Sequence, residues 1–187
     1  MASKWRVAQG DFGAFAPNSD GFALLATDRL HLPQGVRQKI VAKLLAAQKT
    51  GNANATQNGG WSFTATSTGN SDIDMTGAVL SMLCQEGMTP ADEPVAKGLA
   101  WLRTRLNATT GGFGTTTENG VGPNNTPSAA WALIGLKACG VDAQGPDWTT
   151  PGGANPVTFL LSQQRLPQPA DASFGSFKYQ PTTAYPS

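Results

Sequence analysis

The sequence is poor in charge, and this limits the partners it can attract. Only 13% of its 187 residues are charged, and 13 basic residues nearly balance 12 acidic ones, which leaves a net charge of +1. Proteins that bind nucleic acid or an anionic membrane usually carry a marked basic excess. We therefore expect no nucleic-acid partner. No apolar run approaches the roughly 20 residues that cross a bilayer, so we also expect no membrane-spanning segment.

Histidine and cysteine are equally scarce. His31 is the single histidine and precedes Leu32-Pro33 between two predicted helices. No phosphate-binding glycine loop is present, and we expect neither a metal nor a cofactor. The two cysteines, Cys84 and Cys139, do not have the spacing of a metal site. One disulfide between them is an alternative, but we favour two buried thiols, because free cysteine is commonly buried.

Repeats are what the sequence does contain. Three nearly uncharged apolar segments, at residues 22–30, 75–83 and 128–136, predict helices. A shift of 53 residues aligns Leu80 with Leu133 and Leu83 with Leu136. Between them lie three amphipathic segments, whose apolar residues fall on one helical stripe: Val36, Ile40, Leu44 and Ala47; Val95, Leu99, Leu102 and Leu106; Val157, Leu160 and Leu161.

Each amphipathic segment is followed by a polar stretch and then by a turn that combines glycine with aromatic residues. These turns are at residues 59–63, 111–114 and 174–177, and a fourth is at 12–15. An uncharged helix must be buried on several sides, and one pair of helices cannot achieve this alone, so pairs must stack. We predict one all-α domain, 1–187, with helix-pair repeats at about 16–63, 71–115 and 124–177, joined by long Gly/Asn/Thr-rich loops.

The repeats resemble a known family. Residues 159–164 (FLLSQQ) followed by 172–177 (ASFGSF), and 44–48 (LLAAQ) followed by 59–63 (GGWSF), are similar to the prenyltransferase and squalene-cyclase repeat. The resemblance covers about residues 10–180. It implies an α/α toroid of inner and outer helices, usually about six pairs, of which three pairs make half. Such folds serve prenyltransferases, terpene cyclases, cobalamin carriers and complement-like domains, so the fold alone does not choose a function.

One short segment contains candidate catalytic residues. Asp72-Ile73-Asp74-Met75-Thr76 resembles the Asp-x-Asp-Asp-Thr motif of class II terpene cyclases, in which the second Asp is the proton donor. That role would fall to Asp74, and Met75 stands where the third Asp should be. We favour another interpretation, because carboxylates at the start of a helix cap its free N–H groups. We therefore assign no catalytic residue. If the chain is an enzyme, Asp72 and Asp74 are the candidates.

Stacked repeats would place the first residues of all inner helices on one rim, near the aromatic turns. A rim of helix ends, polar side chains and aromatic rings suits a hydrophobic small molecule or a peptide. For the aromatic rings we favour another interpretation, that they are core between repeats. The candidate ligand-binding residues are Asp20, Trp61, Asp72, Asp74, Thr76, Phe113 and Asn125.

Three hypotheses on function follow. We favour a non-enzymatic binding or structural repeat domain from a larger bacterial protein. The others are a relative of the class II (squalene-hopene-type) cyclases and a carrier of a hydrophobic or cobalamin-like ligand. Turns bound the array at both ends, so we expect it to continue and its end faces to self-associate or dock onto further repeats. The sequence does not decide the cellular compartment. One hypothesis is that the chain is extracellular, as part of a longer secreted protein.

Overall fold

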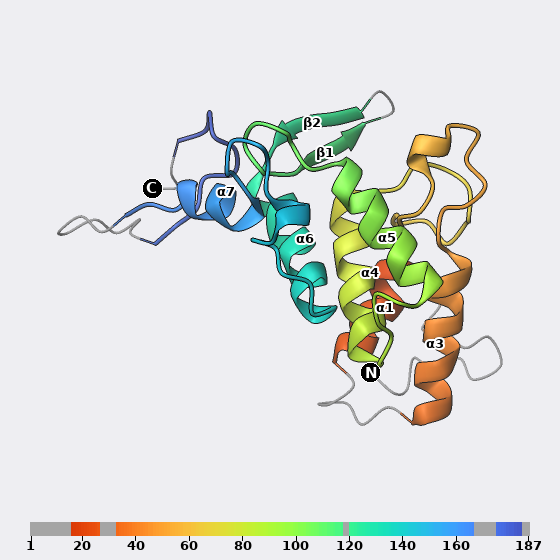
Figure 1. Ribbon diagram of the computed structural model, residues 1–187. Helices are drawn as coiled ribbons and strands as arrows, with labels where there is room; N and C mark the ends of the chain where they lie inside the picture. The colour runs from red at the N-terminus through yellow and green to blue at the C-terminus, as the bar shows by residue number, and fades with distance from the viewer. Residues whose placement is uncertain (1–15, 27–32, 118–119, 167–174, 185–187) are drawn as a thin grey trace.

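The computed structural model describes residues 16–26, 33–117, 120–166 and 175–184 (Figure 1). The turn predicted at 12–15 and His31 lie outside these residues. The described part is mostly helical, which confirms the all-α class in its coarse form. Its α-helices are α1 (Pro17–Leu25), α3 (Gln34–Ala46), α4 (Ile73–Gln85), α5 (Glu93–Thr104), α6 (Thr126–Ala138) and α7 (Pro156–Ser162), and its short 3-10 helices are η2 (Ala55–Gln57) and η3 (Pro146–Trp148).

One element departs from the all-α prediction. β1 (Gly114–Thr117) and β2 (Gly120–Asn124) form an antiparallel pair, in which Gly114 lies opposite Asn124 and Thr117 opposite Gly120. β1 is rich in Thr and β2 in Gly, and neither carries an alternating apolar pattern, so their composition is that of a loop. The pair lies beside the start of α6 (Figure 1).

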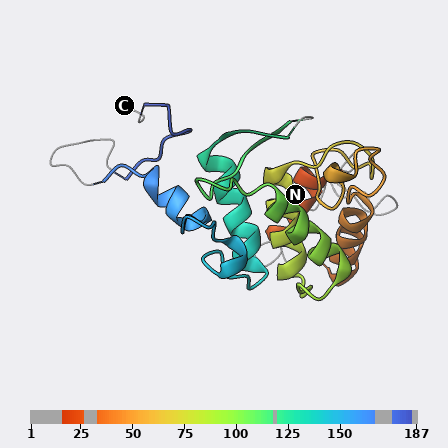
Figure 2. The ribbon, with the colours of Figure 1, turned by 45° about the horizontal axis from the view of Figure 1, so that its top comes forward.

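The helices form a row with α4 in its middle. α4 packs against α1, α5 and α6. α3 packs on α1, and α7 packs on α6. α4 and α6 run in the same direction, and α5 runs the opposite way (Figure 1). Seen from above, α3 lies at one end of the row and α7 at the other (Figure 2).

Glycine brings α4 and α6 into direct backbone contact. A Cβ atom added to Gly77 would lie 2.2 Å from the carbonyl oxygen of Trp131, and one added to Gly135 would lie 2.6 Å from the carbonyl oxygen of Gly77. Both distances are shorter than any side chain tolerates. The two helices therefore pack as closely as they do only because both positions lack a side chain.

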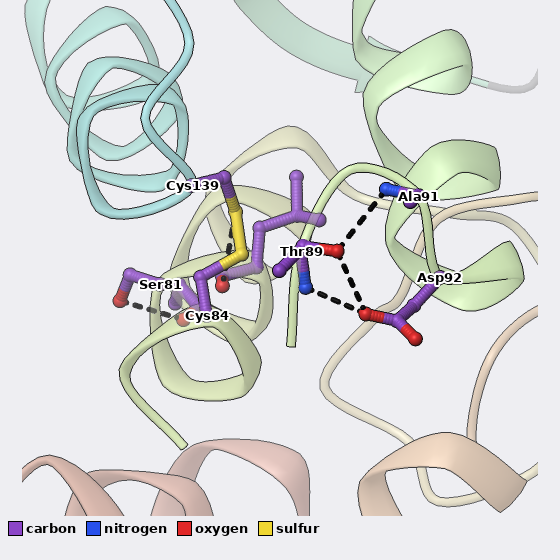
Figure 3. Close-up of a disulfide and its surroundings, with 8 residues drawn as sticks. Ser81, Cys84, Thr89, Ala91, Asp92 and Cys139 are labelled. Atoms are coloured by element: carbon purple, nitrogen blue, oxygen red, sulfur yellow. Dashed lines mark hydrogen bonds between the residues drawn. A yellow bond between two sulfur atoms is a disulfide. The ribbon is translucent and has the colours of Figure 1, made fainter. Parts of the chain in front are cut away.

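A disulfide joins the same two helices at their C-terminal ends. Cys84, in the last turn of α4, is bonded to Cys139, which follows the last residue of α6, and their Cα atoms are 5.1 Å apart (Figure 3). Our preference for two buried thiols was therefore wrong. Sequence spacing could not decide between the alternatives, because it does not tell which helix ends meet in space.

The glycine-aromatic turns share one backbone pattern. Gly59, Gly111 and Gly175 all have positive φ, which favours glycine, and each stands two residues before the aromatic of its turn. The residue before each aromatic accepts a hydrogen bond from the chain that follows the preceding helix: Lys49 N to Gly60 O at 2.8 Å, Asn107 N to Gly112 O at 2.9 Å, and Arg165 N to Ser176 O at 2.8 Å.

Glutamine adds a further bond to two of these turns. Gln48 Nε2 donates to the carbonyl of Gly59 at 2.7 Å, and Gln164 Nε2 donates to that of Gly175 at 3.4 Å. The two glutamines are among the residues that carry the family resemblance. They link the chain that follows α3 and α7 to the turn that comes next.

Candidate functional site

The polar residues of the predicted rim lie at helix starts. Asp72 Oδ1 accepts a hydrogen bond from Met75 N at 2.9 Å, and Asn125 Oδ1 accepts one from Ser128 N at 2.9 Å. Each side chain is the N-cap of its helix, α4 and α6 respectively. The capping interpretation of Asp72 thus agrees with the structure.

Asp20 has a similar role in α1. Its side chain is buried, and Oδ2 accepts hydrogen bonds from Ala16 N at 3.0 Å and from Ser19 Oγ at 3.1 Å. The carboxylate therefore lies among donors at the start of its own helix, where the helix dipole also favours a negative charge.

The two aromatic candidates are core residues. Trp61 and Phe113 are fully buried. The indole Nε1 of Trp61 donates to the carbonyl of Leu44 in α3 at 2.7 Å, so even its polar atom is used inside the protein. Neither ring is presented to a ligand in this conformation, and both fill the space between helix pairs.

Thr76 fixes the position of Trp61. Its Oγ1 accepts a hydrogen bond from Trp61 N at 2.9 Å and lies 3.3 Å from Trp61 O, to which it can donate. The carbonyl of Trp61 also accepts from Asp72 N at 2.7 Å. The same link recurs in the next repeat, where Asn125 N donates to the carbonyl of Phe113 at 2.8 Å. The structure thus brings Trp61, Asp72 and Thr76 together, and Phe113 with Asn125.

The pair of carboxylates in the first turn of α4 has an unusual environment. Burial raises the pKa of Asp72, and the neighbouring charge of Asp74 adds to the rise, while hydrogen bonds from the backbone N–H groups of Met75 and Asp74 oppose it. Oδ1 of Asp74 is buried without a hydrogen-bond partner among the described residues. Met75, at the position of the motif's third Asp, is buried in the core.

Sequence reasoning missed an exposed apolar surface. Phe22 of α1 and Trp131 of α6 are in contact, with ring centroids 5.7 Å apart. Ile134, one turn after Trp131, is 45% exposed, and Phe22 is 41% exposed. We refer to these three residues as the α1–α6 patch. The i, i+3 spacing of Trp131 and Ile134 was the available signal, but the low charge of the segment led us to expect burial on several sides.

In comparisons with known proteins, no protein-family model matches the chain, and no curated protein matches it. The resemblance to the prenyltransferase and squalene-cyclase repeat stays a prediction. None of the helices in the described residues is long and apolar enough to span a membrane. Among those residues, no cluster of His, Cys, Asp and Glu has the form of a metal site.

Proposed function

We propose that the chain is a non-enzymatic binding or structural repeat domain, and that it docks against further helices through the α1–α6 patch. The observation that carries this is the exposure of Phe22 and Ile134. In the middle of the row, α4 buries its apolar residues against helices on several sides. α1 and α6, which flank it, leave large apolar side chains uncovered, as the units of a repeat array do where no further element packs on them.

The structural roles of the rim residues support the same proposal. Asp72 and Asn125 cap helices, Thr76 holds a turn, and Trp61 and Phe113 fill the core. Each of these side chains has a structural task that accounts for its position. The most distinctive motifs of the sequence are therefore explained by the assembly of the helix pairs.

Self-association tests the proposal, because a second copy offers the same patch. Analytical ultracentrifugation over a range of concentrations should show that the wild-type chain associates. Ile134→Lys should shift the chain to monomer, because a charge in a docked apolar surface is costly. Leu161→Lys is the matched control, since Leu161 is also exposed but lies on α7. A wild-type chain that stays monomeric, or an Ile134→Lys chain that associates as well as wild type, would contradict docking through this patch.

A class II cyclase is the second candidate, and the raised pKa of Asp72 beside Asp74 is the observation that favours it. A wild-type chain of this kind should convert a polyprenyl substrate, and Asp74→Asn should abolish the conversion. Asp92→Asn, at an exposed helix start, is the control. Absence of turnover by the wild type would end this hypothesis.

The disulfide supports a proposal on the compartment. Disulfides persist in oxidising surroundings and are rare in the reducing cytoplasm. We propose that the domain works outside the cytoplasm. Alkylation of thiols at the moment of cell lysis, followed by mass spectrometry, should leave Cys84 and Cys139 unlabelled in the native protein. Labelling of both would contradict the proposal.

A further inference from the structure

A groove lies between α5 and the segment that follows α3. It has a volume of about 860 Å³, and η2 forms part of its opposite wall. Figure 1 shows α5 facing this segment. The lining residues that matter here are Lys49, Thr56, Lys97, Ala100, Trp101 and Arg105. None of them belongs to the α1–α6 patch or to the predicted rim.

The charges of the groove are all of one sign. Lys49, Lys97 and Arg105 line it, and no acidic residue does. Lys97 pairs with Glu93 at 2.6 Å on the exposed side of α5. Lys49 and Arg105 are buried, and neither has a carboxylate partner among the described residues. The groove therefore contains two buried cations whose charge the described protein does not balance.

Neutral oxygen atoms hold both cations in place. Lys49 Nζ donates to the carbonyls of Thr64, at 3.2 Å, and Thr66, and to Thr64 Oγ1 at 3.0 Å. These three acceptors use all its protons. Arg105 Nη2 donates to the carbonyl of Thr56, and the guanidinium lies over Trp101, with Cζ 4.9 Å from the ring centroid. The hydrogen bonds and the ring fix the cations but bring no negative charge.

Arg105 is the cation that a ligand could use. The residue is only 7% exposed, and its Nε is buried without a hydrogen-bond partner in the described residues. Burial lowers the pKa of Arg105 and of Lys49, because it removes water from the charged groups. A buried guanidinium is strongly stabilised by an anion that makes paired, charge-assisted hydrogen bonds to its planar fork.

The surface beside Arg105 is apolar. Ala100 is exposed on α5 one turn before Thr104, and Trp101, which lines the groove although it is only 3% exposed, lies under the guanidinium. Trp101 Nε1 already donates to the carbonyl of Thr56 at 3.1 Å, so the indole offers a ligand apolar contact only. The groove thus combines a positioned guanidinium, which has an unused donor, with an apolar wall.

We propose that this groove binds a small organic anion, with its acidic group against Arg105 and its apolar body against Ala100 and Trp101. The occupant is a small molecule, and a groove of this size is ordinary for ligands of that class. The site goes beyond the proposed docking function and does not depend on it, since it lies on different residues. Failure of either proposal leaves the other standing.

Two dyes that differ only in charge provide the test. 8-Anilinonaphthalene-1-sulfonate carries an acidic group on an aromatic body, and N-phenyl-1-naphthylamine is the same body without the sulfonate. Fluorescence titration of the whole chain should show saturable binding of the sulfonate and at least about tenfold weaker binding of the neutral dye, because the charged contact is lost. Arg105→Met should weaken sulfonate binding by a similar factor and leave the neutral dye unaffected.

A second variant protects the test against loss of folding. Ala100→Trp fills the groove without removing a charge and should abolish binding of the sulfonate. Ala96→Trp is its matched control, because Ala96 is exposed on the same helix one turn earlier and does not line the groove. Arg103→Gln, on the exposed side of α5, is the control for Arg105→Met. Both controls should bind the sulfonate as wild type does. Equal affinity for the two dyes, or undiminished binding by Ala100→Trp, would overturn the proposal.

Discussion

α4 and α6 have the same length and equivalent caps but lie in two different settings. Both have 13 residues and are related by a shift of 53 positions, which also aligns their N-caps, Asp72 and Asn125. Both end in a glycine with positive φ, Gly87 and Gly140. Yet α4 is buried almost throughout, whereas α6 leaves Ile134 and Lys137 exposed.

The difference lies both in the neighbours and in the residues, because α6 has Ile134 and Lys137 where α4 has Ser81 and Cys84. α4 packs against α1, α5 and α6, whereas α6 packs mainly against α4 and α7 and contacts α1 through Trp131. Propensity and caps act within a few residues of the chain and fix where each helix begins and ends. Burial depends on what other segments bring to each face. Four predictions test how the contacts of α4 and α6 determine stability.

The disulfide is expected to have the largest effect, because it ties the two helices together. Cys84 and Cys139 are 55 positions apart, and closing a loop of that length in the unfolded chain corresponds to about 4 kcal/mol in the chain-entropy model. Replacing both cysteines with serine should lower the free energy of unfolding by about 4 kcal/mol, within the usual range of about 2–5 kcal/mol, measured by guanidinium denaturation. Reducing the wild type should give the same loss. A stable, unchanged double variant would show that the glycine contact alone holds α4 to α6.

Equivalent leucines test the role of neighbours directly. Leu80 of α4 is fully buried against α5, and its equivalent in α6, Leu133, is only partly buried. Leu80→Ala should cost about 2–5 kcal/mol, since it removes buried surface and leaves a cavity. Leu133→Ala should cost less than about 1.5 kcal/mol. Denaturation of the two variants in parallel checks the difference. Equal losses would mean that Leu133 is covered as well as Leu80 in solution.

The glycine contact comes next in size. Gly77→Ala forces a methyl group to within 2.2 Å of the Trp131 carbonyl oxygen, and backbone cannot move aside as a flexible side chain can. We expect a loss of about 1–3 kcal/mol in thermal or denaturant unfolding. Gly35→Ala, in the first turn of α3 and with open space around its Cβ position, is the matched control. It should be neutral or stabilising by about 0.5–1 kcal/mol. A neutral Gly77→Ala would contradict the close approach of α4 and α6.

The sequence predicted the local features of this fold well. The caps at Asp72 and Asn125 and the glycine-aromatic turns follow from residue types that act on nearby backbone. Prediction failed where two distant segments meet. The disulfide depends on the ends of α4 and α6 lying together. The β-hairpin was missed for another reason, because its two adjacent strands have the composition of a loop. The groove depends on Arg105 of one repeat reaching Thr56 of the previous one.

At the candidate site, too, the local features were predicted and the long-range contacts were not. The rim was predicted from the positions of helix starts, and those residues are indeed at helix starts, but the sequence could not show that Trp61 and Phe113 point into the core. The α1–α6 patch was missed for the opposite reason. A run of uncharged residues indicates burial only when neighbours exist to cover it, and neighbours are a property of the assembled row.

The smallest effect concerns the one chemical difference between the two N-caps, a carboxylate at Asp72 and an amide at Asn125. Burial raises the pKa of Asp72 in the folded protein, so the folded state favours the protonated form more than the unfolded state does. That stability is present in acid, below the ordinary pKa of about 4, and is lost as the pH rises through the folded pKa. Asn caps as well as Asp, so Asp72→Asn should equal wild type in acid.

As the pH rises toward neutral, Asp72→Asn should become more stable than wild type by up to about 1 kcal/mol, the usual scale of N-cap changes. Asn125→Asp is the reciprocal variant and should lose stability over the same direction of pH, because Asn125 is more deeply buried than Asp72. Denaturant unfolding across acid and neutral pH measures both. If Asp72→Asn instead fell below wild type at neutral pH, the helix dipole and the backbone donors would outweigh burial at the start of α4, and the cap would favour the charged form despite its surroundings.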